Sequence, residues 1–141
     1  MTMITTGIVV AAALGFLISA YGYYVEQKLK KDTQYKPTCD LSDTISCSKP
    51  LLSSYGKLLG IQNALVGIIY YPTIIIFVFL YIPIVLFALT AIAGIVSLYL
   101  AWILFFKIRT LCMLCLAIYL INLVLFILSL LLIADRFHRI Y

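Results

Sequence analysis

The sequence predicts an all-α integral membrane protein: a four-helix bundle with a cysteine-bearing loop and a short surface helix between its first two membrane helices. Three observations lead to this fold class. The 141-residue chain is 65% hydrophobic and 11% charged, whereas soluble domains carry about 25% charged residues. Residues 1–25, 58–106 and 111–134 contain no Asp, Glu, Lys or Arg. The four cysteines form two pairs, one in the polar segment after the first apolar run and one at the start of the last run.

The three uncharged runs provide four membrane crossings. A crossing needs about 20 apolar residues, so the first and last runs give one helix each, and the longer middle run gives two. Pro83 divides the middle run because proline interrupts the helical hydrogen-bond ladder. We interpret the first run as a retained span and not a signal peptide, since no basic residue precedes it and it is too long for an ordinary signal core. The predicted single domain, 1–141, has helices at about 4–24, 61–80, 83–106 and 111–134, and a redox loop at about 26–60.

An even number of crossings places the redox loop and the 107–110 turn on one side and both termini on the other. The loop side carries most of the basic residues, namely Lys28, Lys30, Lys31, Lys36, Lys49, Lys57, Lys107 and Arg109. The positive-inside rule would therefore place the loops in the cytosol. Disulfide chemistry favours the opposite, oxidising side. We give more weight to the cysteine pattern and expect the loops on the oxidising side.

A short helix is expected directly after Cys47. Its apolar residues at 51, 52, 55, 58 and 59 have the spacing of one helical stripe. Pro50 suits the first turn of a helix. We expect this helix to lie on the membrane surface over the mouth of the bundle.

Cys112 and Cys115 form a Cys-x-x-Cys pair at the start of the last helix. Residues three apart share one helix face, and a bridge between them is reachable but strained, which suits a labile redox pair. The helix dipole, Lys107 and Arg109 should favour the thiolates. Two alternatives remain: inert packing of small residues, and zinc ligation together with the other two cysteines.

Cys39 and Cys47 bracket a short polar segment. A single disulfide that staples the loop explains them structurally. In the functional interpretation they are a shuttle pair, which accepts electrons from a soluble dithiol and passes them to the membrane pair.

The predicted pocket uses polar side chains within the helices. Tyr119 lies one helical turn after Cys115 and so shares its face. An O–H of Tyr119 and an amide N–H of Asn63 could each hold one carbonyl of a quinone. We also assign Val66 and Tyr70 to the substrate-binding set, although Tyr70 equally fits an aromatic belt. For Asn122, a pocket role and an interhelical hydrogen bond are equally supported.

Several segments together resemble the vitamin K epoxide reductase family. They are Cys39–Ser48, Asn63–Gly67, Tyr99–Phe106, and Cys112–Cys115 followed by Tyr119 and Asn122. The resemblance covers about residues 16–130. The short connection from Gly60 to Asn63 departs from the vertebrate members and looks like the bacterial and archaeal ones.

The resemblance implies a four-helix bundle around a quinone pocket. It implies that Cys112 and Cys115 are the active-site pair, with Cys115 facing the quinone, and that Cys47 exchanges with Cys112. Cys39 would receive electrons from a thioredoxin-like or protein disulfide isomerase-like dithiol protein. Asn63 and Tyr119 match the positions that hydrogen-bond the substrate oxygen. No thioredoxin-like sequence follows the fourth predicted helix, so we expect that partner to be a separate protein.

These observations predict a membrane oxidoreductase that reduces vitamin K epoxide and vitamin K quinone with electrons from dithiols. We expect the quinone as substrate, no tightly bound cofactor and no metal. The basic residues suggest lipid headgroups and not nucleic acid. We expect the endoplasmic reticulum membrane with lumenal cysteine loops; a bacterial or archaeal plasma membrane is the alternative location.

Two rival functions are also consistent with the sequence. The first is a quinone-coupled thiol oxidase that drives disulfide formation in secreted proteins, since it needs the same loop pair and membrane pair of cysteines. The second is a non-enzymatic four-helix membrane protein that its cysteines merely staple.

Overall fold

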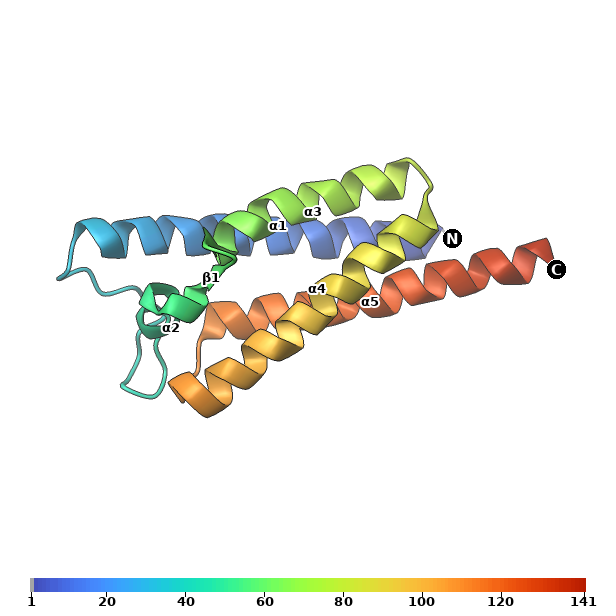
Figure 1. The fold of residues 1–141 in the computed structure, drawn as a ribbon. Coiled ribbons are helices and arrows are strands. Elements are labelled where there is room, and N and C mark those ends of the chain that lie inside the picture. The colour runs from blue at the N-terminus through green and yellow to red at the C-terminus, as the bar shows by residue number, and fades with distance from the viewer. Residues whose placement is uncertain (1) are drawn as a thin grey trace.

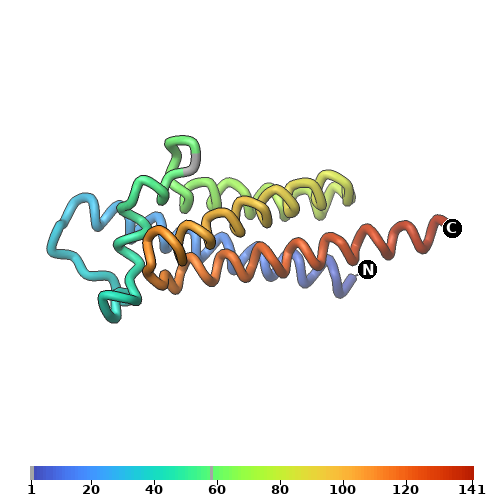
Figure 2. Tube along the Cα trace, turned by 60° about the horizontal axis from the view of Figure 1, so that its bottom comes forward, coloured from blue at the N-terminus to red at the C-terminus, as the bar shows by residue number. Residues whose placement is uncertain are grey.

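Four apolar helices make up the bundle. The computed structural model describes residues 2–141 apart from the side chain of Leu58; Met1, the first residue of the predicted domain, lies outside the described residues. The helices are α1 (Thr2–Lys31), α3 (Asn63–Phe79), α4 (Pro83–Ile103) and α5 (Met113–Ile140). Both termini lie at one end of the bundle and the cysteine-bearing segment at the other (Figures 1 and 2). The predicted all-α membrane bundle is confirmed: three helices are long and apolar enough to cross a membrane, and α3 is a shorter apolar helix.

The first and last helices extend beyond their predicted ends. α1 continues to Lys31 instead of ending near residue 24, and α5 continues to Ile140 instead of 134. The uncharged runs mark the part of each helix that suits a bilayer, whereas the helical backbone itself tolerates charged residues. Three lysines in the last turn of α1 also interact favourably with the negative end of the helix dipole.

The two short connections between helices are set by local backbone chemistry. Tyr81 adopts a left-handed conformation (φ 55°), and Pro83 follows at the first position of α4, where its missing N–H is not needed. α4 thus begins at Pro83, the residue at which the sequence divides the middle run. α4 continues into a π-helical turn, η2 (Leu104–Ile108), which ends at Arg109 in a second left-handed conformation (φ 52°).

Close packing and buried hydrogen bonds hold the helices together. α1 packs on α3 and α5, and α4 packs on α5. A Cβ atom on Gly15 of α1 would overlap the ring of Tyr71 on α3, so the glycine allows the close approach. Asn122 of α5 accepts a hydrogen bond from the Tyr71 hydroxyl (3.1 Å) and donates one to Oγ of Ser97 on α4 (2.7 Å). This amide thus links three helices.

The predicted surface helix is present but shorter than its apolar stripe. It comprises α2 (Ser48–Leu52), and the chain then forms a 3-10 turn, η1 (Ser54–Gly56), and a hairpin of β1 (Lys57–Leu58) and β2 (Ile61–Gln62). Ser53 between the two turns has an extended conformation (ψ 159°), which ends the helix before residue 55. The positions at 58 and 59 therefore belong to the hairpin, whose turn uses Gly60 at φ 85°.

Candidate active site

The Cys112–Cys115 pair forms the start of α5. Cys112 is the residue before the first helical turn, and its sulfur accepts a hydrogen bond from the backbone N–H of Cys115 (3.3 Å). Both thiols are free; Cys112 is fully buried and Cys115 is partly exposed. The two sulfurs therefore sit at the positive end of the α5 dipole.

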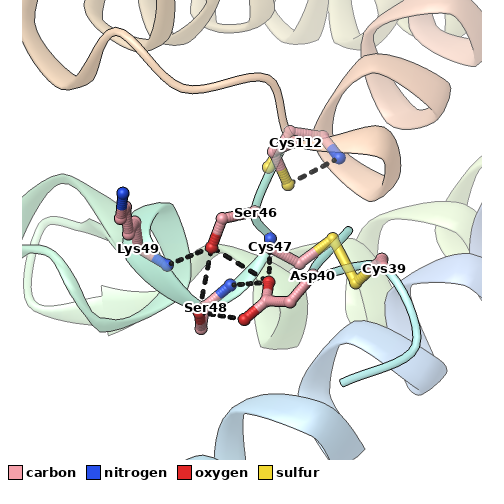
Figure 3. The surroundings of a disulfide bond; sticks show 8 residues. Cys39, Asp40, Ser46, Cys47, Ser48, Lys49 and Cys112 are labelled. Carbon is pink, nitrogen blue, oxygen red and sulfur yellow. Dashed lines mark hydrogen bonds between the residues drawn. A yellow bond between two sulfur atoms is a disulfide. The ribbon is translucent and has the colours of Figure 1, made fainter. Parts of the chain in front are cut away.

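Strand-like hydrogen bonds dock the redox loop beside this pair. The backbone N–H of Leu111 donates to the carbonyl of Thr44 (2.7 Å), and the N–H of Ser46 donates to the carbonyl of Leu111 (2.9 Å). Cys47 follows directly, and it joins Cys112 and Leu104 in one buried cluster. Figure 3 shows Cys47 and Cys112 on facing segments. Although 65 positions separate them in the sequence, the two cysteines are brought together.

Cys39 and Cys47 are joined by a disulfide, with their Cα atoms 5.8 Å apart. Cys47 has no exposed surface, whereas Cys39 is partly exposed. Of this pair, Cys39 is the sulfur that a partner protein can reach from outside.

Asp40 fixes the conformation of the loop around Cys47. Its Oδ1 accepts hydrogen bonds from Oγ of Ser46 (2.9 Å) and from the backbone N–H groups of Cys47 (2.7 Å) and Ser48 (3.1 Å). Its Oδ2 accepts a hydrogen bond from Oγ of Ser48 (Figure 3). Burial opposes ionisation, but these hydrogen bonds outweigh it, first among them that from Ser48, and they lower the pKa of the Asp40 carboxyl.

The electrostatics of Cys112 favour its thiolate. Its hydrogen bond with the Cys115 side chain is the largest effect on the thiol, and the N–H groups of Cys115 and Leu114 act in the same direction. Together they lower the pKa of Cys112 against the opposing effects of burial and of the nearby Asp40 charge. Lys107, expected to assist, instead places its ammonium on Tyr55, 5.5 Å from the ring centroid.

A largely apolar cavity of about 270 Å³ opens inside the bundle next to Cys115. All four predicted substrate-binding residues line it: Asn63, Val66, Tyr70 and Tyr119. Asn122 lines it too, although both ends of its amide are occupied by the interhelical hydrogen bonds to Tyr71 and Ser97. The redox pair and the predicted pocket residues thus meet at one place.

The amide of Asn63 is oriented differently from the expectation. Its N–H group, predicted to point at a substrate carbonyl, donates to the backbone carbonyl of Tyr55 (3.3 Å). Its Oδ1 is buried and has no hydrogen-bond partner within the described part of the chain. In this orientation the unpaired atom of the Asn63 amide is an acceptor, which suits a hydroxyl and not a carbonyl.

Comparison with known proteins identifies the family of this chain. The sequence model of the vitamin K epoxide reductase family matches residues 7–130. The chain belongs to the vitamin K epoxide reductase family. Vitamin K epoxide reductase complex subunit 1 of Mus musculus is 32% identical over an alignment of 133 residues. The match covers 82% of this chain and 81% of the mouse protein. The corresponding protein of Rattus norvegicus is 31% identical, with the same coverage of each chain.

Membership of the vitamin K epoxide reductase family, together with the membrane-length helices, makes this chain an integral membrane oxidoreductase of that type. A quinone substrate and a lipid bilayer are what the family and the helices imply. The Cys39–Cys47 disulfide takes two of the four sulfurs that the zinc alternative required. Nor do three metal-ligating side chains converge anywhere among residues 2–141.

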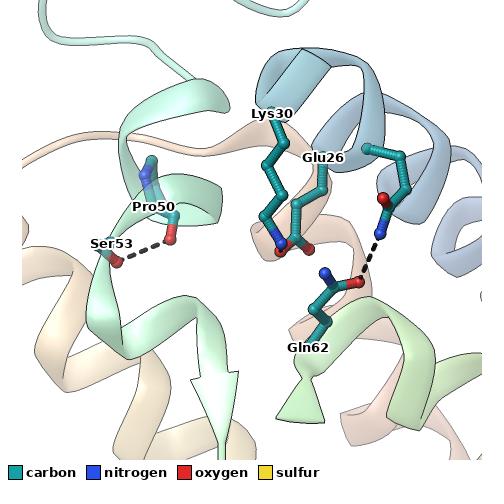
Figure 4. Close-up of polar contacts among 6 residues, drawn as sticks. Glu26, Lys30, Pro50, Ser53 and Gln62 are labelled. Carbon is teal, nitrogen blue, oxygen red and sulfur yellow. Dashed lines mark hydrogen bonds and ion pairs between the residues drawn. The ribbon is translucent and has the colours of Figure 1, made fainter. Parts of the chain in front are cut away.

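Two features of this vitamin K epoxide reductase relative were not anticipated from its sequence. One is the apolar wall that α4 gives the cavity, with Leu89, Ile92, Ala93, Val96 and Leu100. Large apolar residues cover every face of α4, and only its buried small polar residues, Thr90 and Ser97, seven positions apart, could have marked the inner side. The other is Glu26 of α1, which is fully buried near α2 and β2 and pairs with Nζ of Lys30 at 2.8 Å (Figure 4). In the sequence, a glutamate just after an apolar run is expected to be solvated. Only the packing of the folded chain reveals that Glu26 is buried.

Proposed function

We propose that this chain reduces vitamin K epoxide and vitamin K quinone with electrons from dithiols, relayed from Cys39–Cys47 to Cys112–Cys115. The observation that carries the proposal is the continuous path of sulfurs. It begins at the partly exposed Cys39, passes through the buried Cys47 and Cys112, and ends with Cys115 in the cavity wall. A quinone-sized ligand can occupy the cavity, whose apolar lining suits a fused ring.

The chemistry at the ring begins with the thiolate of Cys115, which forms when its thiol passes the proton of their hydrogen bond to the Cys112 sulfur. It attacks a carbon of the substrate ring, and the sulfur of Cys112 then attacks Cys115, so that the 112–115 disulfide forms and an electron pair stays on the ring. From the epoxide, the oxygen leaves as water and the quinone is formed; from the quinone, the product is the hydroquinone. In both cases the dithiol gives up two electrons and two protons.

Asn63 and Tyr119 hold the substrate oxygen during these steps. The hydroxyl of Tyr119 donates to the oxygen on which negative charge develops. Asn63, with its free Oδ1, accepts from the hydroxyl that appears as the oxygen is protonated. Val66 and Tyr70 pack against the ring from α3.

The loop pair then regenerates the active site. An external dithiol first reduces the Cys39–Cys47 disulfide. The thiolate of Cys47 attacks Cys112 of the spent disulfide and releases Cys115 as a thiol. Cys39 attacks Cys47 in turn and releases Cys112, so one pair of electrons has moved inwards. The hydrogen bonds that lower the pKa of Cys112 make it a good leaving group in this last step.

We further propose the partner and the location of this chain. A thioredoxin-like or protein disulfide isomerase-like protein supplies the electrons at Cys39. The membrane is that of the endoplasmic reticulum, with the cysteine-bearing end lumenal. Chemistry between thiols and a quinone needs no tightly bound cofactor.

Turnover by wild type, Cys115→Ala and Cys39→Ala tests the proposal, with vitamin K epoxide and vitamin K quinone as substrates. With dithiothreitol, wild type should reduce both substrates and Cys115→Ala neither. Cys39→Ala should retain turnover with dithiothreitol, which is small enough to attack the partly exposed Cys115 of the spent disulfide directly, and lose it with a protein dithiol. Reduction of the quinone alone would favour the thiol oxidase instead. Full activity of Cys115→Ala would refute the assigned chemistry.

A further inference from the structure

Two adjacent tyrosines of α3 differ in how their hydroxyls are used. The rings of Tyr70 and Tyr71 are in edge-to-face contact, with centroids 5.0 Å apart, and both line the cavity. The hydroxyl of Tyr71 donates to Asn122 at 3.1 Å. The hydroxyl oxygen of Tyr70 is buried as well, but no group in the described chain hydrogen-bonds it.

An unpaired buried hydroxyl needs an explanation, because leaving it without a partner costs free energy. Phenylalanine would fill the same space without that cost. Nor does an aromatic belt account for it: Tyr70 lies seven residues into α3, about 10 Å from the cysteine end of the helix. Because Tyr70 lines the cavity, a ligand bound there can supply the missing acceptor once the hydroxyl turns towards it.

Tyr70 and Asn63 lie on the same face of α3, because seven residues are nearly two helical turns. Each carries a buried polar atom without a hydrogen-bond partner among residues 2–141, Oδ1 of Asn63 and the hydroxyl of Tyr70. Helical side chains slope towards the N-terminus, so the Tyr70 hydroxyl lies nearer to Asn63 than the backbone rise alone suggests. Two residues that line the cavity with Cys115 thus carry polar atoms unpaired within residues 2–141, one at the start of α3 and one deeper in the bundle.

We propose that the Tyr70 hydroxyl donates a hydrogen bond to the ligand oxygen at the far end of the ring, opposite the oxygen that Asn63 and Tyr119 hold beside Cys115. The inference rests on the proposed function and adds a specificity determinant to it. The pocket selects 1,4-diones, and it disfavours hydrocarbons of the same shape, because these leave the Tyr70 hydroxyl unpaired.

The test measures binding of 2,3-dimethyl-1,4-naphthoquinone and of 2,3-dimethylnaphthalene, which has the same rings and methyl groups but no oxygen. The parent protein carries Cys112→Ser and Cys115→Ser, so that the dione is bound but not reduced. Adding Tyr70→Phe should weaken dione binding about three- to tenfold, as expected for one lost hydrogen bond. Binding of the hydrocarbon should be unchanged or tighter.

Tyr71→Phe is the matched control for folding. It removes a paired hydroxyl and leaves Asn122 without that donor, so it should lower the unfolding temperature of the ligand-free protein. Tyr70→Phe should leave that temperature unchanged or raise it. An unfolding temperature lowered as much by Tyr70→Phe as by Tyr71→Phe would mean that the hydroxyl has a structural partner, and would overturn the inference.

A double variant with Tyr119→Phe tests which oxygen is held. If Tyr70 and Tyr119 hold different oxygens, their effects on the dissociation constant multiply. A double variant no weaker than Tyr119→Phe alone would refute the assignment to the far oxygen. Dione binding by the parent with no loss on Tyr70→Phe overturns this inference alone. Absence of dione binding by the parent overturns the proposed function with it.

Discussion

The carboxylate of Asp40 should decide how firmly the redox loop stays docked on α5. Asp40→Ala removes an acceptor of four hydrogen bonds, from Ser46, from the backbone of Cys47 and from both the backbone and side chain of Ser48. Two of these donors are the backbone N–H groups of Cys47 and Ser48 at the start of α2. The Cys39–Cys47 disulfide remains, so the loop stays closed but loses its fixed shape.

The size of the effect follows from these contacts. A hydrogen bond to a charged group contributes about 1.5–3 kcal/mol when buried. Asp40 is only partly buried, so water replaces part of what is lost, and we expect a total of about 2 kcal/mol. At about 1.4 kcal/mol per factor of ten, the undocked population should rise about 30-fold.

Amide hydrogen exchange in nanodiscs measures that population directly. The N–H groups of Ser46 and Leu111 are suitable reporters, because they bond across the docking contact and not to Asp40. Both should exchange about 30-fold faster in Asp40→Ala. Asp43→Ala is the control, since Asp43 is exposed in the same loop and offers only its backbone carbonyl, to Lys49. Unchanged exchange in Asp40→Ala, or equal acceleration in Asp43→Ala, would refute the role given to Asp40.

Three further predictions concern the bundle and its pH response. Gly15→Ala places a methyl group in the Tyr71 ring and should cost about 1–3 kcal/mol of stability in thermal unfolding, whereas Gly94→Ala, with open space around its Cβ, should cost nothing. Asn122→Leu leaves the hydroxyls of two neighbouring helices without their partner, and its free energy of unfolding should fall by about 1–3 kcal/mol; a stable variant would show that the amide is dispensable. Because the folded-state pKa of Asp40 lies below its unfolded value of about 3.9, its stabilisation is fully present above that value and is lost as the pH falls through the folded pKa. The stability difference between wild type and Asp40→Asn should therefore be constant from about pH 7 to 4 and shrink below; a difference that grows in acid would contradict the assignment.

Some of the site could be predicted because its chemistry depends on neighbours in the sequence. The spacing of Cys112 and Cys115 at a helix start follows from local geometry alone, and so does Tyr119 one turn further on. The orientation of the Asn63 amide could not be predicted in this way. It depends on the carbonyl of Tyr55, which a 3-10 turn and a hairpin bring back to the start of α3.

The sequence by itself determined that the chain resides in a lipid bilayer, roughly where its membrane helices lie, and that its four cysteines form two pairs. Long uncharged runs can be stable only in lipid, and proline marks the break between two of them, so these features need no knowledge of packing. The tertiary structure decided which apolar surface faces the cavity, and it brought Cys47 against Cys112. Within residues 2–141, it also left the hydroxyl of Tyr71 paired and that of Tyr70 unpaired. The physical reason is that lipid and the cavity are both apolar, so the two sides of a helix such as α4 differ in polarity only at Thr90 and Ser97. Only the close approach of helices, set by contacts such as Gly15 against Tyr71, determines which side encloses the cavity.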